Sequence, residues 1–307
     1  MKFGSVVGLD APVSRVVLGT VAFSTERREQ AYDVLDRYVE LGGNTIDAAA
    51  VYNAGLSEQV VGDWMSSRNN RDQVVLIGKG AASRQCTPEL VTADLLDSLS
   101  RLQISSIDVY MLHRDNPDLP ASVFVDILNE HHRAGRIRTF GGSNWEPARI
   151  AEANVYAKSR GLVGFTASSP NFSLGVWKEE PWDDCCSASD PATRDWYRAE
   201  DIALFAWSSQ AGGFFTSRNT GRAGDTDPEL VRVWFTDDNF ARLARARELG
   251  LEKGASPAEI ALSYVLCQPS NMFALIGPRS INELESSIAA VAVELNAGQL
   301  AYLNLES

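Results

Sequence analysis

Short apolar, β-branched runs alternate along this chain with longer segments of helical periodicity. Eight such runs begin near Val16, Asn44, Val74, Ile107, Ile137, Val163, Ile202 and Phe273. The first five intervals between these starts span 26 to 33 residues, the length of a strand followed by a returning helix. Strands that alternate with amphipathic helices predict a parallel sheet covered by helices.

Capping residues stand before several of the helical segments. We expect caps from Ser24 or Thr25, Ser57, Thr87, Ser256 and Ser280, before helices over residues 26–41, 58–65, 88–102, 257–268 and 281–290. The helices and strands therefore alternate along nearly the whole chain.

Eight strands with about as many helices predict an α/β fold, a (β/α)8 TIM barrel formed by a single domain over residues 1–307. An open doubly wound sheet is the alternative, but it calls for a glycine-rich turn after the first strand. The stretch Leu18-Gly19-Thr20-Val21-Ala22 lacks that pattern. The two longest intervals predict long loops after strands six and seven, over residues 175–200 and 208–238.

Composition narrows the class of partner. The net charge of −12 argues against nucleic acid and anionic membranes, since both require positive surface. The four cysteines show no metal-ligand spacing, and no run reaches the roughly 18 apolar residues of a membrane span. Without an apolar leader at the start, we expect a cytoplasmic protein, a monomer or small homo-oligomer that acts on a small molecule.

Four ionisable side chains stand at or just beyond the ends of three successive runs: Asp47, Tyr52, Lys79 and His113. The carboxyl ends of all strands in a barrel open on one face, so we expect the four to converge there. Taken singly, each has an ordinary explanation, such as a loop cap for Asp47 or a packed aromatic for Tyr52. Their recurrence at successive strand ends favours a chemical site.

These side chains suit proton transfer to a carbonyl oxygen. A tyrosine hydroxyl is a poor acid at its ordinary pKa of about 10. We expect a cationic Lys79 to lower the pKa of Tyr52, and Asp47 to keep Lys79 protonated. His113 is placed to orient a carbonyl oxygen through a hydrogen bond.

The pattern resembles the catalytic tetrad of the aldo-keto reductase family, and the resemblance runs nearly end to end. It rests on Gly43-Asn44-Thr45-Ile46-Asp47, then Tyr52 with Ser57-Glu58, then Lys79, then Leu112-His113. It implies hydride transfer from NAD(P)H to an aldehyde or ketone. Tyr52 would act as the general acid, tuned by Lys79 and Asp47, with His113 orienting the carbonyl.

The same resemblance implies a cofactor site for NADPH, with NADH as the second possibility. Ser143, Asn144 and Ser169 match the positions that hold the nicotinamide carboxamide, although the family often has Gln where Ser169 stands. Trp207 would stack on the nicotinamide. The remaining implied contacts come from Gly19, Thr20, Asp47, Ser208, Gln210, Gly212, Ile276, Gly277, Arg279, Glu283 and Ser287.

Two departures bear on the choice of cofactor. Glu283 stands where many members carry Gln or Arg, and a carboxylate beside a 2′-phosphate would repel it. Arg279 favours NADPH because its guanidinium matches a phosphate. Ser209-Gln210 replace a Pro-Leu pair in the phosphate loop, which leaves the path of that loop open.

We expect the substrate to contact Tyr52, His113, Phe23 and Trp145. Tryptophans in the predicted long loops are further candidates for an apolar pocket. Arg114 and Asp115, directly after His113, offer contacts to a polar substrate instead. Aldehyde, ketone, sugar and quinone substrates all remain open.

Two other functions are alternatives to a carbonyl reductase. A catalytically weak nucleotide-binding regulatory subunit of the same fold predicts nucleotide binding with negligible turnover. A barrel glycosidase needs two carboxylates at strand ends, and Asp47 is the single clear candidate.

Overall fold

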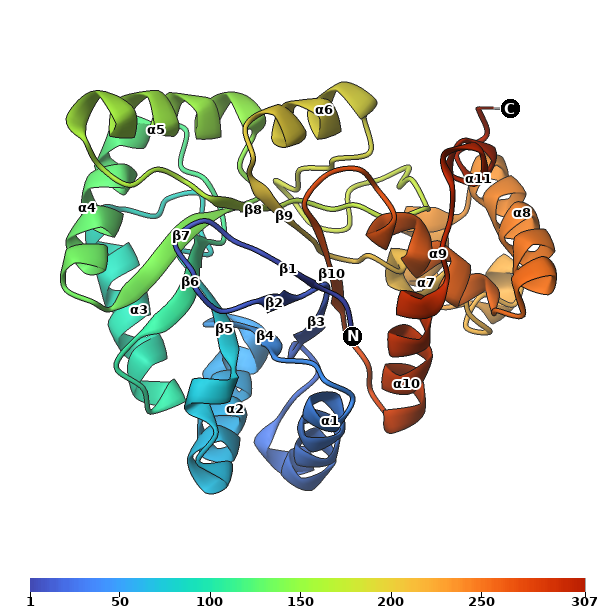
Figure 1. Cartoon of the computed structure of the whole chain (residues 1–307), viewed down its shortest axis with the longest axis horizontal. Coiled ribbons are helices and arrows are strands. Elements are labelled where there is room, and N and C mark those ends of the chain that lie inside the picture. The colour runs from blue at the N-terminus through green and yellow to red at the C-terminus, as the bar shows by residue number, and fades with distance from the viewer. Residues whose placement is uncertain (307) are drawn as a thin grey trace.

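Eight parallel strands close into a barrel in the computed structural model, which describes residues 1–306 (Figure 1). In chain order they are β3 (Val16–Gly19), β4 (Thr45–Ala49), β5 (Val75–Gly80), β6 (Ile107–Leu112), β7 (Ile137–Ser143), β8 (Ala167–Ser169), β9 (Ala203–Ala206) and β10 (Met272–Ile276). Each strand pairs with its neighbour in sequence, and β10 closes the ring against β3. The predicted barrel is confirmed, and the open doubly wound sheet was wrong.

Helices surround this ring, and their colours run from blue through green and yellow to red around it in Figure 1. They are α1 (Arg28–Glu40), α2 (Leu56–Arg68), α3 (Pro88–Leu102), α4 (Ala121–Arg133), α5 (Pro147–Arg160), α6 (Pro191–Ala199), α7 (Pro228–Trp234), α8 (Asp237–Lys253), α9 (Pro257–Leu266), α10 (Ile281–Ala289) and α11 (Ala297–Leu303). The two long insertions carry α6 and α7, so neither is wholly loop.

The predicted caps divide into two groups. Thr87, Ser256 and Ser280 each accept a backbone N–H of the first helical turn, as expected. The prediction was wrong for the first two helices. The N-cap of α1 is Arg27, and that of α2 is Gly55, whose φ of 86° suits glycine. Ser57 lies within α2 and is buried, and its hydroxyl bonds to the backbone carbonyl of Thr20 instead of capping the helix.

A short hairpin covers the amino-terminal end of the barrel. Its strands, β1 (Phe3–Gly4) and β2 (Val13–Ser14), pair antiparallel and lie across the centre of the ring in Figure 1. Val6 and Val13 from this segment join the inward-facing side chains of the strands in one buried cluster. That end is therefore plugged by apolar packing.

Strand alternation decides which side chains enter the barrel. Ile77 and Met111 belong to the interior cluster. Successive side chains on a strand face opposite sides, so Lys79 and His113, two residues further on, continue the inward rows. The interior is thus apolar near the hairpin and becomes charged toward the carboxyl ends.

All four cysteines are free thiols. Within residues 1–306, no group of three or more His, Cys, Asp and Glu side chains is arranged to hold a metal ion. Nor does any helix in this range have the length and apolar character needed to cross a membrane.

The contact between β7 and β8 leaves no room for a side chain at Gly141. A Cβ at this position would lie 1.9 Å from the carbonyl oxygen of Ala167 on the neighbouring strand. We expect Gly141→Ala to lower the free energy of unfolding by about 2 kcal/mol or more, because backbone must move to relieve the overlap. Urea denaturation measures this. Gly224→Ala is the control, since a Cβ there meets no atom within 4 Å; equal stability of the two variants would contradict the prediction.

Candidate active site

A buried ion pair joins β4 and β5 at the carboxyl end of the barrel. The side chain of Lys79 pairs with Oδ1 of Asp47, and the two residues are 2% and 1% exposed. Asp47 lies opposite Ile77 in the strand register, and Lys79 lies opposite Ala49. The two side chains therefore meet diagonally across one strand pair, inside the barrel.

The Tyr52 hydroxyl lies on top of this pair. Its residue opens the 3-10 turn Tyr52–Gly55, which follows β4 directly. The hydroxyl accepts a hydrogen bond from Nζ of Lys79 at 3.1 Å and donates one to Oδ2 of Asp47 at 3.2 Å. Asn53 and Ala54 adopt left-handed backbone, with φ of 49° and 54°, in the turn that carries the tyrosine. The three predicted side chains form one connected group.

The electrostatics of this group differ from the sequence-based expectation. Burial lowers the pKa of Lys79, but Asp47 and Tyr52 together outweigh that effect, so its pKa rises and the amine stays protonated. Burial and the Asp47 carboxylate raise the pKa of Tyr52 to about 12, although Lys79 acts in the opposite direction. The prediction that Tyr52 has a lowered pKa was therefore wrong for this protein without its ligands. The hydroxyl is protonated at neutral pH.

His113 follows β6 and faces Tyr52. The two rings meet edge to face, with centroids 6.0 Å apart. Burial first, then the charges of Lys79 and Arg114, lower the pKa of His113 well below its ordinary value. Its Nδ1 is buried and has no hydrogen-bond partner among the described residues. The ring is therefore neutral, and no described residue takes up the hydrogen-bonding capacity of its Nδ1.

Thr20 and Ser57 form a supporting layer that the sequence analysis missed. The Thr20 hydroxyl bonds the carbonyl oxygen of Asp47 at 3.0 Å and the Ser57 hydroxyl at 2.6 Å. Ser57 also donates to the carbonyl of Thr20 at 2.8 Å. Thr20 is 0% exposed and its side chain holds Asp47 in place, while its contact with a cofactor stays a prediction. Its position beside Gly19 at a strand end was the only available signal.

The three residues expected at a carboxamide gather at the ends of β7 and β8. Ser143 donates to the carbonyl of Ser169 at 3.0 Å, and Asn144 donates to the Ser143 hydroxyl at 3.2 Å. Oδ1 of Asn144 accepts from the Trp207 indole and from the Cys186 backbone, both at 3.2 Å. One N–H of the Asn144 amide has no partner, which suits the oxygen of a carboxamide, while Ser143 and Ser169 are 1% exposed and Asn144 is 7% exposed.

The loop after β9 presents backbone donors. Trp207 is its first residue, and Ser208 and Gly212 have φ of 48° and 62°. The backbone N–H groups of Ser208, Ser209 and Gln210 donate to no residue within 1–306, while those of Ala211 and Gly213 close turns. Donors grouped in such a turn suit phosphate oxygens.

The segment after β10 completes the predicted cofactor contacts. Gly277 and Arg279 are exposed, whereas Ile276 and Ser287 are buried, so Ile276 offers only backbone there. Glu283 accepts the Arg279 backbone N–H at 2.7 Å and thus stabilises the entry to α10. Gln210 donates to the Ser287 hydroxyl at 3.3 Å, which links this segment to the loop after β9.

Two predicted substrate contacts are core residues. Phe23 is 4% exposed and Trp145 is 0% exposed, and both belong to the buried cluster between strands and helices. Trp145 packs against Phe124 and Phe165 with centroids 5.5 and 5.0 Å away. Neither ring is open to a ligand in this structure, so their burial counts against the predicted contact with a substrate. Tyr52 and His113 are half-buried there.

Comparison with known proteins gives a family match over nearly the whole chain. Residues 15–305 match the model of the Aldo/keto reductase family. The norsolorinic acid reductase stcV of Emericella nidulans is 30% identical, over 92% of this chain and 76% of that protein.

Two solved structures share the fold. The thermostable aldo-keto reductase Tm1743 superposes with a TM-score of 0.79 at 18% identity, over all of both chains. An aldo/keto reductase from Klebsiella pneumoniae, in complex with NADP and acetate, gives 0.73 at 22% identity, covering 97% of this chain and 93% of that one. At 18% and 22% identity, this structural similarity shows the fold alone.

Removing the cation from the buried pair tests its contribution to stability. Lys79→Met leaves the Asp47 carboxylate buried without a partner, and we expect the free energy of unfolding to fall by about 3–5 kcal/mol. Because the pair raises the pKa of Lys79, its stabilisation is present at neutral pH and is lost only as pH rises through that raised value. Adding Asp47→Asn should recover part of the loss in denaturant unfolding. Lys158→Met, at an exposed position, is the control; a similar small loss in both would contradict the prediction.

The protonation state of Tyr52 can be measured directly. We expect a difference titration of the ultraviolet absorbance, wild type minus Tyr52→Phe, to show no phenolate from this residue at pH about 10, the ordinary tyrosine pKa. The reason is that burial and Asp47 outweigh Lys79. Phenolate that appears near neutral pH would instead mean that Lys79 dominates.

Proposed function

This chain belongs to the aldo/keto reductase family, and from that premise we propose that it is an NADP-dependent oxidoreductase that reduces the carbonyl group of a small molecule at Tyr52. The observation that carries the proposal is the contact of one hydroxyl with both a lysine at 3.1 Å and a carboxylate at 3.2 Å. The overall reaction consumes an aldehyde or ketone, NADPH and a proton, and yields an alcohol and NADP⁺.

The cofactor has a fitting set of residues. The free N–H groups of Ser208 and Gln210 would hold its phosphates, and Arg279 is available for a 2′-phosphate because its guanidinium pairs with no described side chain. Ser143 and Asn144 would hold the carboxamide. When bound, the nicotinamide supplies the hydride that reduces the carbonyl carbon.

Tyr52 supplies the proton. Its hydroxyl donates to Asp47 in the structure, so the proton must turn from that carboxylate to the carbonyl oxygen of the substrate. The Lys79 ammonium contacts the same oxygen and stabilises the negative charge that Tyr52 acquires as it gives the proton away. Asp47 keeps Lys79 cationic, and neutral His113 orients the carbonyl oxygen by a hydrogen bond.

The first experiment combines binding with turnover. NADPH and NADH are titrated by quenching of tryptophan fluorescence, then aldehydes and ketones are added and the absorbance of the reduced cofactor is followed. We expect NADPH to bind more tightly than NADH and to be consumed. Binding without consumption across the panel would favour the nucleotide-binding regulatory subunit, and absence of binding would contradict both.

Replacing the proton donor separates chemistry from binding. We expect Tyr52→Phe to lower kcat by about 10²–10⁴-fold, the usual contribution of a positioned acid, with NADPH affinity unchanged. Tyr156→Phe is the control, because that hydroxyl is bonded to Asp126 on the outer helices. Retained turnover in Tyr52→Phe would refute the mechanism.

A further inference from the structure

Arg114 places an unpaired guanidinium beside the candidate site. Its Nη1 donates to the carbonyl oxygen of His113 at 2.8 Å, and its Nη2 lies 4.0 Å from Sγ of Cys185. No carboxylate of residues 1–306 forms an ion pair with it, and the residue is half-buried. The charge of this guanidinium also acts on His113, which places it next to the candidate site.

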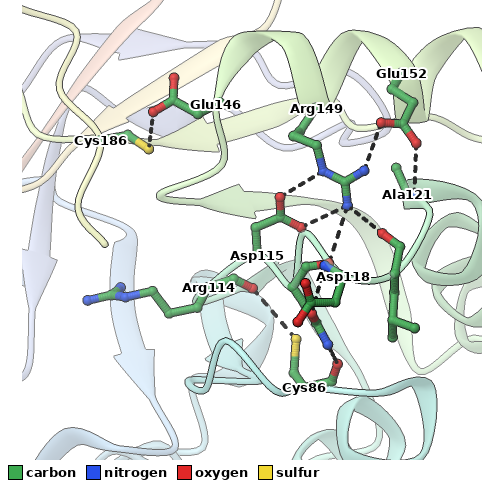
Figure 2. Close-up of polar contacts among 11 residues, drawn as sticks. Cys86, Arg114, Asp115, Asp118, Ala121, Glu146, Arg149, Glu152 and Cys186 are labelled. Carbon is green, nitrogen blue, oxygen red and sulfur yellow. Dashed lines mark hydrogen bonds and ion pairs between the residues drawn. The ribbon is translucent and has the colours of Figure 1, made fainter. Parts of the chain in front are cut away.

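The adjacent acid does not neutralise Arg114. Figure 2 shows the Arg114 side chain extending away from Asp115, which binds both Nε and Nη2 of Arg149, at 2.8 and 3.1 Å. Two acids of the insertion are also engaged elsewhere. Glu180 accepts the Cys185 backbone N–H at 3.5 Å, and Asp184 pairs with Arg84. Most of the hydrogen-bonding capacity of the guanidinium is therefore free for a ligand.

The same insertion brings a tryptophan cluster to the site. Trp177 and Trp182 pack on Trp207, with ring centroids 5.7 and 5.5 Å from it. The Trp207 indole and the Cys186 backbone share Oδ1 of Asn144, while Cys185 contacts Arg114. Cys185 and Cys186 are neighbours in the sequence, so Arg114 and the tryptophan cluster lie on the same part of the rim, by which we mean the loops at the carboxyl end of the barrel.

The rim is also apolar where it meets water. Trp182, Val21 and Val51 are 61%, 57% and 49% exposed. Val21 follows β3 and Val51 follows β4, so both stand at the carboxyl end of the barrel with the tetrad. Large exposed apolar side chains gathered beside a site favour an apolar ligand.

We propose that the substrate is an aromatic aldehyde or ketone that carries a carboxylate or a similar anionic group. Arg114 binds the anion, and Trp177 and Trp182, which pack on Trp207, contact the aromatic ring. A guanidinium beside an indole surface suits such a ligand, because it offers paired donors to a carboxylate next to an apolar face. This inference rests on the proposed function, and it makes Arg114 a specificity-determining residue.

The test compares substrates that differ in one charge. The probes are 3- and 4-carboxybenzaldehyde and their uncharged methyl esters, with NADPH. We expect at least one acid to have a kcat/KM about tenfold or more above its ester, through KM, as a charge-assisted hydrogen bond supplies. Arg114→Met should bring the ratio of kcat/KM for acid over ester down to about one, mainly through a higher KM for the acid, and Arg114→Lys should restore part of the preference. Arg136→Met is the control, since that half-buried arginine lies at the opposite, amino-terminal end of β7.

Other outcomes overturn the inference. Acids and esters used equally by the wild type would refute it, as would an Arg114→Met variant that loses kcat for both, because the arginine would then only position His113. The ring contact is tested by Trp182→Ala, which should raise KM for the aromatic acids but not for an aliphatic aldehyde.

A binding measurement separates this inference from the proposed function. With NADP⁺ present, 4-(hydroxymethyl)benzoate and its methyl ester are titrated by tryptophan fluorescence against wild type and Arg114→Met. Tighter binding of the acid to wild type alone supports the role of Arg114 even if no aldehyde is reduced. Equal binding of acid and ester refutes that role whether or not the enzyme turns over.

Discussion

The buried pair of Asp47 and Lys79 is the constraint on which the site depends. Two charges this deeply buried are tolerated only when they neutralise each other, so the lysine stays protonated and the carboxylate stays fixed. Tyr52 forms hydrogen bonds with both partners, so the pair fixes the position of its hydroxyl. Thr20 holds the backbone of Asp47 and connects it to Ser57 in α2. Polar groups thus hold the tyrosine from the barrel interior outward.

The apolar half of the barrel makes this arrangement possible. On the amino-terminal side of the pair, inward-facing residues such as Val75 and Ile77 fill the interior. The hairpin residues Val6 and Val13 close the far end. Water is thereby kept from the charges on one side, which strengthens the field around the tyrosine. The opposite side is closed only by loops. The charged residues of the site, the floor, therefore lie between the apolar interior of the barrel and the loops of the rim.

Asn144 connects the floor to that rim. Its amide binds Ser143 in the barrel, Trp207 in the loop after β9, and the Cys186 backbone in the insertion. A change in the insertion would therefore be felt at the residues that are expected to hold the nicotinamide. The same insertion places Cys185 against Arg114, next to His113. The residues proposed to select the substrate and those expected to hold the cofactor therefore belong to one connected set of contacts.

Local pattern determined the barrel and the identity of its four ionisable residues. The period of two along Ile77 and Lys79, and the recurrence of strands, already required these side chains to meet at one end. Some helix N-caps, such as Thr87, could also be predicted from the sequence, because the capping hydrogen bond joins residues three positions apart. The sequence alone therefore indicated which end of the barrel carries these four ionisable side chains and that they lie close together.

Tertiary structure decided everything that depends on neighbours distant in sequence. The pKa of Tyr52 is raised because burial and Asp47 outweigh Lys79, a balance of distances that no spacing encodes. Phe23 and Trp145 face the core since the packing of helices on strands, and not loop position, sets their direction. Arg114 is free only because Arg149, on a helix 35 residues away, takes Asp115. Sequence fixes which groups are present, but burial and long-range pairing fix which of them are left to act.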